Sequence, residues 1–146
     1  MDWKLEVVVI PVSDVDRAKH FYAEQLGFHV DVDQSRGPEF RVVQLTPPGS
    51  GCSVTIGKGL TEAAPGSVKG MQLCVGDLDA ARAELVGRGV EVTPIRHVGE
   101  RGWQDGRGED WNAFVFFDDP DGNSWTVQES PVLRAELDLE RAAAPA

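Results

Sequence analysis

The two halves of this chain carry the same pattern. An apolar, β-branched run that ends in Val-x-Asp-hydrophobic-Asp begins at residue 7 and again at residue 70. Each half also contains a short strand-like run that follows a Pro/Gly turn, at residues 52–57 and 123–128. A duplication of this size predicts two similar modules, and the cleft that two such modules share is the expected place for a ligand.

Helix signals occupy equivalent positions in the two halves. Ser13 and Asp16 have the spacing of a capping box, and Gly27 supplies the stop for the first helix. The second helix begins at Asp77 and ends at Gly89. Before each helix lies an apolar run whose β-branched residues favour a buried strand.

Short strands are expected after each helix, separated by turns rich in Pro and Gly. Each half therefore reads strand, helix, strand, strand, strand. Residues 58–69 are expected to link the halves, and a tail over 131–146 carries Leu among charges, which suits a short helix. The expected strands are 5–12, 28–33, 39–45 and 52–56 in the first half, and a run from 70, 90–98, 113–117 and 124–129 in the second.

Charge and composition exclude some partners. The formal net charge of −10 argues against nucleic acid, whose binding depends on Lys and Arg at the phosphates, and against an anionic membrane surface. No apolar stretch approaches the roughly 20 residues that span a bilayer. Residues 1–4 lack the character of a signal peptide, so we expect a cytoplasmic protein. Cys52 and Cys74 show no CxxC spacing and are expected to be small buried hydrophobes in a reducing compartment.

Several motifs together resemble a known family. They are Pro11–Ala18 with Phe21-Tyr22 and Leu26-Gly27-Phe28 in the first half, and Phe116–Asn123 near the end. These residues resemble the vicinal oxygen chelate superfamily, which includes glyoxalase I, extradiol dioxygenases and bleomycin resistance proteins. The resemblance covers about residues 4–130. It implies an α+β fold of two βαβββ modules that form an eight-stranded half-open cup around a pocket.

The expected boundaries follow from the same resemblance. A single glyoxalase-like domain spans residues 1–130, with module one at about 4–57, the linker at 58–69 and module two at about 70–130. Within it, Asp119-Pro120-Asp121-Gly122 is a turn with a structural duty. The Phe21-Tyr22 pair is expected to fill the core between helix and sheet.

Metal-dependent members of the family place four inward His, Glu or Gln ligands on the first and last strands of the modules. Aligned on the motifs above, these positions fall on Val7, Thr55, Gly70 and Thr126. Val and Gly offer no side-chain donor, and a neutral Thr hydroxyl is a poor replacement for imidazole or carboxylate. Gln44 is an oxygen donor but lies on a third strand. We therefore expect no metal site and no other cofactor.

The three histidines do not form a chelate. His20 lies in the first helix, His29 begins a strand and His97 lies in a later strand, and no two have the spacing of a metal site. His97 remains a catalytic candidate because its strand leads into an unusual loop.

That loop covers residues 99–112 and mixes four glycines with Trp103 and Trp111. Loops of this length are often lids, and tryptophan supplies a broad apolar surface for stacking. The alternative is a solvated loop whose tryptophans anchor it to its own domain or to a partner subunit. The loop carboxylates Asp105, Glu109 and Asp110 are expected to be solvated or paired with nearby arginines.

Strand alternation sends the same face inward as the four former metal positions. The inward side chains are apolar, amide or hydroxyl groups, a neutral lining that suits a small neutral or aromatic molecule. The expected ligand-binding residues are Val7, Thr55, Gln72, Trp103, Trp111, Thr126 and Gln128.

Three functional classes remain open at this point. The first is a metal-independent protein that binds a small molecule, similar to the antibiotic-binding members of the family. The second is a glyoxalase- or dioxygenase-like lyase or oxygenase, either with a metal in another register or with His97 or a loop carboxylate as its catalytic group. The third is an interaction module whose cup is filled by its own side chains. The resemblance also implies a homodimer.

Overall fold

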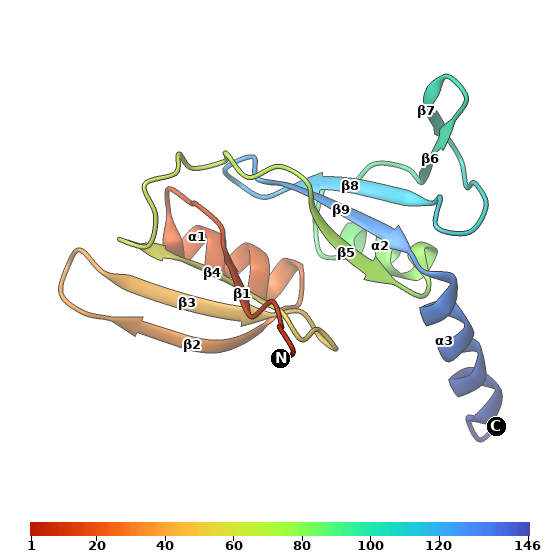
Figure 1. The fold of residues 1–146 in the computed structure, drawn as a ribbon, viewed down its shortest axis with the longest axis horizontal. Coiled ribbons are helices and arrows are strands. Elements are labelled where there is room, and N and C mark those ends of the chain that lie inside the picture. Colours follow the sequence, from red (N-terminus) through yellow and green to blue (C-terminus); the bar gives the residue numbers. More distant parts are fainter. The chain divides into compact units, whose positions relative to one another are not determined.

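The computed structural model describes residues 1–146, which divide into two compact units. Unit 1 contains Met1–Lys69 and the short segment Asp118–Asn123, and unit 2 contains Gly70–Phe117 and Ser124–Ala146. Figure 1 shows one sheet in each unit. The predicted α+β fold of two repeated modules is confirmed, with one more strand in the second module than expected. No helix combines the length and apolar character that crossing a membrane requires.

Unit 1 is a four-stranded sheet, sheet A, with helical turns on one face (Figure 1). The strand order is β1-β4-β3-β2, in which β1 runs parallel to β4 and the other neighbours are antiparallel. The elements are β1 (Val7–Val9), α1 (Val15–His20), the π-helix η1 (Phe21–Gln25), β2 (His29–Ser35), β3 (Arg41–Thr46) and β4 (Ser53–Lys58).

The start of α1 differs from the predicted capping box. Asp14, rather than Ser13, is the N-cap, because its carboxylate accepts the Arg17 backbone N–H at 3.0 Å. The Ser13 hydroxyl instead donates to Asp121 Oδ1 at 2.5 Å. The helix continues as η1, and Gly27 follows it with φ 77°, which confirms the predicted stop.

The two faces of sheet A have different surroundings. The face toward the helix is buried and joins side chains of α1 and η1, including Phe21 and Tyr22, which confirms that this pair belongs to the core. Val7 and Val9 lie on the other face and are each 38% exposed. The buried side chains of the unit include Ile10, Ala18, Phe21, Tyr22, Leu26, Phe28, Val43, Leu45, Val54 and Ile56.

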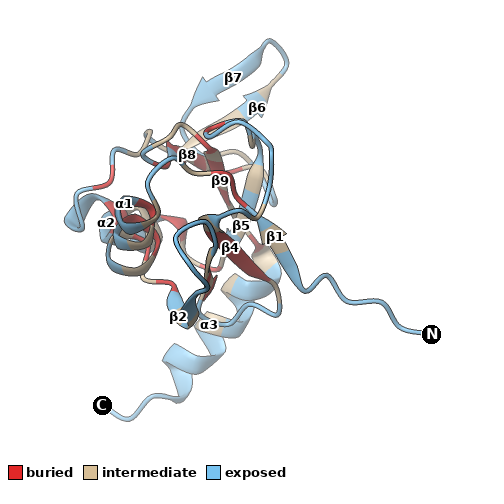
Figure 2. Cartoon of the chain, turned by 90° about the vertical axis from the view of Figure 1, so that its left-hand side faces the viewer, coloured by how far each residue is buried: buried red, intermediate tan, exposed pale blue.

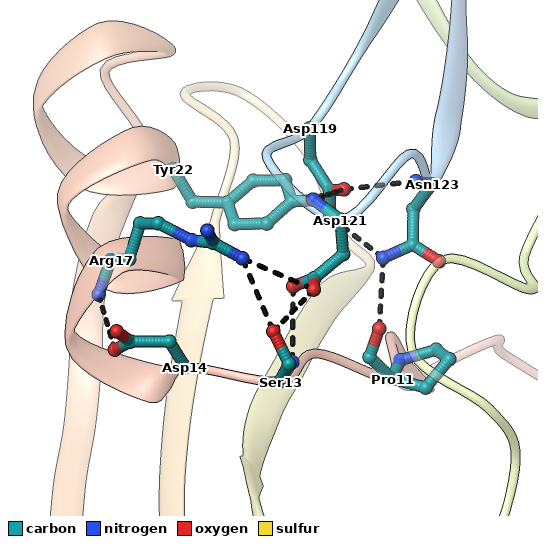
Figure 3. Close-up of polar contacts among 8 residues, drawn as sticks. All are labelled: Pro11, Ser13, Asp14, Arg17, Tyr22, Asp119, Asp121 and Asn123. Carbon is teal, nitrogen blue, oxygen red and sulfur yellow. Dashed lines mark hydrogen bonds and ion pairs between the residues drawn. The ribbon is translucent and has the colours of Figure 1, made fainter.

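A polar network in unit 1 joins the Asp-Pro-Asp-Gly turn to the β1–α1 connection (Figure 3). The hydroxyl of the fully buried Tyr22 donates to Asp119 Oδ2 at 2.7 Å. Asn123, also fully buried, donates from Nδ2 to Asp119 and to the Pro11 carbonyl. Asp121 receives the backbone N–H and hydroxyl of Ser13. The turn has the structural role expected of it, because its side chains provide the hydrogen-bond partners of Pro11 and Ser13, which lie far away in the sequence.

Unit 2 contains a five-stranded sheet, sheet B, in the order β5-β9-β8-β6-β7, with β5 parallel to β9. Two helices accompany it, and α2 begins at the N-cap Asp77, as predicted. The elements are β5 (Met71–Val75), α2 (Leu78–Gly87), β6 (Arg96–Gly99), β7 (Gly102–Asp105), β8 (Phe114–Asp118), β9 (Ser124–Glu129) and α3 (Pro131–Ala143).

Two predictions for unit 2 were wrong in part. The strand expected over 90–98 begins only at Arg96, and the expected loop over 99–112 contains β7, which pairs with β6 in a hairpin. The cysteines also differ from expectation. Cys74 is exposed and Cys52 is half-buried, and both are free thiols. Figure 2 shows α3 and the tip of the β6–β7 hairpin as exposed surfaces.

Candidate ligand-binding site

The open face of sheet B gathers amide, hydroxyl and aromatic side chains. Gln72 on β5 lies opposite Thr126 on β9, so the two side chains share this face, and Gln128 follows Thr126 by two residues. Phe114 and Phe116 on β8 also lie on it, because the alternating Val115 and Phe117 are buried on the helix side. The helix side of sheet B is formed by Val115, Phe117, Trp125 and Val127.

A chain of amide hydrogen bonds crosses this open face. Gln72 Nε2 donates to Gln128 Oε1 at 2.7 Å, and Gln128 Nε2 donates to the Trp111 carbonyl, also at 2.7 Å. Trp111 has φ 63°, a left-handed conformation that is rare for a large side chain. The amide chain therefore holds a strained residue of the loop against the sheet.

Trp103 forms the aromatic part of the same face. Its ring centroid lies 5.3 Å from that of Phe114 and 5.0 Å from that of Phe116, with the planes nearly perpendicular. Trp103 remains 52% exposed despite these contacts. Edge-to-face packing thus fixes the indole while leaving apolar surface on which a planar molecule can stack.

The predicted site residues of unit 2 fall into two groups. Gln72, Thr126, Gln128 and Trp103 lie on the open face, and the Trp111 backbone is bonded to it. His97 is on the opposite face of β6, because Val98 is the residue paired with Trp103. The His97 Nδ1 atom lies 2.9 Å from the Gly106 carbonyl. Because a carbonyl oxygen can only accept, Nδ1 is the donor in this bond, and His97 connects β6 to the residue that follows β7.

The two predicted site residues of unit 1 lie on the open face of sheet A. Thr55 on β4 pairs with Val9 and Gln44, and Val7 pairs with Ser53. Thr55 is 7% exposed and Val7 is 38% exposed. This face carries apolar, hydroxyl and amide groups in adjacent strands, and toward β2 the Asp31 carboxylate accepts the Thr46 hydroxyl, which also contacts Ser53.

The four positions that the resemblance assigns to the family's metal ligands do not offer the donors that a divalent ion needs. Val7 and Thr55 in unit 1 supply a single hydroxyl, and Thr126 supplies the only side-chain oxygen of the pair in unit 2. Gly70 has φ 82°, so any side chain placed there as a ligand would be in a strained backbone conformation. No group of three or more His, Cys, Asp and Glu side chains is placed to hold a metal ion.

A cavity of about 140 Å³ lies beside the loop that carries Trp111. It opens between residues 107–111 and the start of α3, and Glu129 forms part of its wall. Burial by itself would raise the pKa of Glu129, but hydrogen bonds from the Leu78 amide, Arg107 and Arg134 outweigh it and lower that pKa. The carboxylate is therefore held in its charged form.

The sequence did not single out Phe114 and Phe116 as part of the site, nor the ion pairs of Glu129. The two phenylalanines carried a signal, since Phe-Val-Phe-Phe alternates faces once it is read as a strand. The Glu129 contacts carried none, because they join residues whose proximity depends on the tertiary fold.

Two units that each follow the order strand, helix and further strands, with a mixed sheet in each, define the glyoxalase-like class of fold. The chain belongs to the Glyoxalase/Bleomycin resistance protein/Dioxygenase superfamily, whose family model matches residues 4–127.

Two solved structures are similar to this chain in sequence and fold, and one curated protein is similar in sequence. TnmS3, an antibiotic binding protein from Streptomyces sp. CB03234, is 31% identical, covers 88% of this chain and 97% of its own, and has a TM-score of 0.71. A member of the superfamily from Sphaerobacter thermophilus DSM 20745 is 30% identical, with coverage of 88% and 98% and a TM-score of 0.70. The uncharacterized protein YetH of Bacillus subtilis (strain 168) is 25% identical over 127 residues, which are 86% of this chain and 98% of YetH.

Proposed function

We propose that the protein binds a small neutral or aromatic molecule without a metal ion, in the manner of an antibiotic-binding or metabolite-sequestering protein. The observation that carries this proposal is the open face of sheet B. There, an exposed Trp103 held by two phenylalanines lies in the same sheet as the Gln72–Gln128 amide pair. Aromatic surface with a few placed polar groups is the usual lining of small-molecule sites.

The chemistry of the former metal positions supports the metal-free part of the proposal. Lyase and oxygenase reactions of the superfamily depend on an ion that binds the substrate oxygens, and Val7, Thr55, Gly70 and Thr126 do not offer the donors for it. The similarity to TnmS3, described as an antibiotic binding protein, supports an antibiotic-like ligand. The His97 imidazole faces away from Trp103, so its position does not favour catalysis at this face.

The proposal is tested by titrating tryptophan fluorescence with a panel of aromatic antibiotics and metabolites, with and without EDTA. We expect at least one compound to bind with an affinity that EDTA leaves unchanged. Trp103→Leu should weaken that binding about tenfold, because stacking surface is lost. Trp3→Leu is the matched control, since Trp3 is 88% exposed and lies in the N-terminal segment.

Two results would contradict the proposal. One is a flat titration over the whole panel. The other is an equal effect of Trp103→Leu and Trp3→Leu on a compound that does bind. Binding that disappears with EDTA and returns with added metal would restore the metal-dependent alternative.

We also propose a cytoplasmic homodimer. Val7 and Val9 on sheet A and Leu5 before it expose between 38% and 70% of their surface, an apolar strip that a second copy can cover. Light scattering measures the mass directly, and a monomer at micromolar concentration would exclude the dimer.

A further inference from the structure

The C-terminal helix α3 lies beyond the residues that the superfamily model matches. That match ends at residue 127, whereas α3 spans Pro131–Ala143. Ser130 caps the helix by accepting the Leu133 N–H, and none of its residues is fully buried. The helix therefore depends on a few specific contacts with the rest of unit 2, and those contacts indicate its role.

One of these contacts is a carboxylate that α3 shares with the loop. Arg134 on α3 donates to Glu129 Oε2 at 3.0 Å, and the Leu78 amide donates to the same oxygen at 2.9 Å. The other oxygen, Oε1, accepts a hydrogen bond from Arg107 at 2.5 Å. With Oε2 fixed from two directions, Oε1 is aimed at the loop. The Glu129 side chain is only 14% exposed, so these bonds are partly shielded from water.

The loop of residues 106–112 follows β7, and its internal hydrogen bonds make it compact. It leads to the open face of sheet B. The Gly108 N–H donates to the Asn112 carbonyl, and the Asn112 side chain bonds both the N–H and the carbonyl of Val98 on β6. The Trp111 backbone carbonyl accepts a hydrogen bond from the Gln128 side-chain amide on the open face of sheet B. Glu129 points to the other face, toward α2, because it follows Gln128 in the strand. The loop is thus fastened on both faces of β9.

A pocket lies beside the loop between these two attachments. The cavity of about 140 Å³ separates residues 107–111 from Pro131 and Arg134. Side chains on the two sides of this opening do not pack across it, and on this side the Arg107–Glu129 hydrogen bond connects the loop to β9. Arg107 also pairs with Asp79 on α2 at 2.5 Å, but the Asp79 side chain is 70% exposed, so this contact contributes less.

We infer that Arg134 is a positioning residue for the ligand site. It orients Glu129, Glu129 holds Arg107, and Arg107 holds the loop that places Trp111 beside the open face of sheet B. Arg134 itself does not touch the ligand. This inference rests on the proposed function for its purpose, but the mechanical coupling is a property of the free protein and can be measured without a ligand.

Hydrogen exchange of the loop amides tests the coupling. Arg134→Gln should speed exchange in residues 106–112 about threefold, the size expected for one partly exposed ion pair, and leave β5 unchanged. Arg134→Lys keeps the charge and should restore part of the protection. The matched control is Arg141→Gln, which removes another arginine of α3 that pairs with Asp77 and leaves Glu129 intact.

A double-mutant cycle separates coupling from general loosening. If Arg134 acts through Glu129 and Arg107, the Arg134→Gln change should have little further effect on loop exchange in an Arg107→Gln background. Equal effects of Arg134→Gln in both backgrounds, or equal effects of Arg134→Gln and Arg141→Gln, would overturn the inference.

The ligand arm distinguishes this inference from the proposed function. For a compound found in the fluorescence titration, Arg134→Gln should weaken binding about threefold, and Arg141→Gln should not. Unchanged loop exchange and affinity in Arg134→Gln, with normal binding by the wild type, would end the inference and leave the proposed function standing. Altered exchange in a protein that binds nothing in the panel would support the coupling and contradict the proposed function.

Discussion

At the scale of single residues, the most constrained group is the buried network of Tyr22, Asp119 and Asn123. Asp119 accepts the Tyr22 hydroxyl, the Asn123 side chain and the backbone N–H groups of Asp121 and Asn123. Asn123 also satisfies the Pro11 carbonyl. A buried polar group costs free energy unless it is hydrogen-bonded. Other conformations of the turn would leave these groups unpaired, so the network favours a single conformation.

Tyr22→Phe tests this network with a minimal change. It removes only the hydroxyl that donates to Asp119, and the buried carboxylate loses one partner. We expect the free energy of unfolding in urea to fall by about 1–2 kcal/mol. Ser13→Ala removes the exposed hydroxyl bond to Asp121 and should cost less than about 0.5 kcal/mol. Equal losses in the two variants would show that burial does not decide the cost.

At the scale of elements, helix-capping residues and strand alternation predicted secondary structure better than the composition of the loops did. Asp77 and Gly27 have the local geometry that the sequence requires of them, because capping depends on a few neighbouring residues. The strand expected from residue 90 begins only at Arg96, for a local reason. The Val90 N–H closes the end of α2 on the Leu85 carbonyl, and Pro94 has no N–H to give to a ladder.

The hairpin of β6 and β7 could not be predicted because its sequence is rich in glycine and charge. Those residues have low strand propensity, and the pairing gains its apolar contact from Trp103 on Phe114 and Phe116, which lie further along the chain. For the candidate site, too, alternation within a strand was informative and tertiary contacts were not. Alternation placed Gln72, Thr126 and Gln128 on one face, whereas the tertiary contacts of Glu129 carried no sequence signal.

The docking of α3 depends on a close approach at Gly76. A Cβ added there would lie 2.6 Å from Leu137 Cδ1 and 2.7 Å from the Leu133 carbonyl oxygen. Gly76→Ala should therefore displace α3, with a loss of about 1–3 kcal/mol in urea unfolding and faster exchange of its amides. Gly87→Ala, in α2 with open space around the added carbon, should instead stabilise by up to about 1 kcal/mol. A stabilised Gly76→Ala protein would contradict this packing.

The lowered pKa of Glu129 gives the loop attachment a pH dependence. Folding favours the charged carboxylate, so its contribution is complete above the ordinary pKa of 4.5 and is lost as the pH falls through the lower folded-state value. Exchange of residues 106–112, corrected for its intrinsic pH dependence, should therefore accelerate on acidification below about pH 4.5. In Glu129→Gln the loop should already be loosened at pH 7 and should change less with pH. A wild-type loop that keeps full protection at pH 2 would exclude this role.

At the scale of the whole molecule, the two units are not consecutive pieces of chain. Unit 1 comprises Met1–Lys69 and also Asp118–Asn123, the segment between β8 and β9 near the end of the second repeat. This segment supplies the partners of Tyr22, Ser13 and the Pro11 carbonyl. The duplication therefore produced two modules of similar topology, one of which depends on a short segment of the other repeat.

Separating the repeats tests this dependence. A fragment of residues 1–69 lacks Asp119 and Asn123, so the Tyr22 hydroxyl and the Pro11 carbonyl lose their buried partners. We expect this fragment to show no cooperative unfolding transition by circular dichroism, because two unpaired buried groups cost several kcal/mol in a unit of marginal size. Adding residues 70–146 should restore the transition, and a 70–146 fragment with Asp119→Ala and Asn123→Ala should restore it poorly. Cooperative unfolding of 1–69 alone, at the midpoint of the intact chain, would show that the segment contributes nothing essential to unit 1.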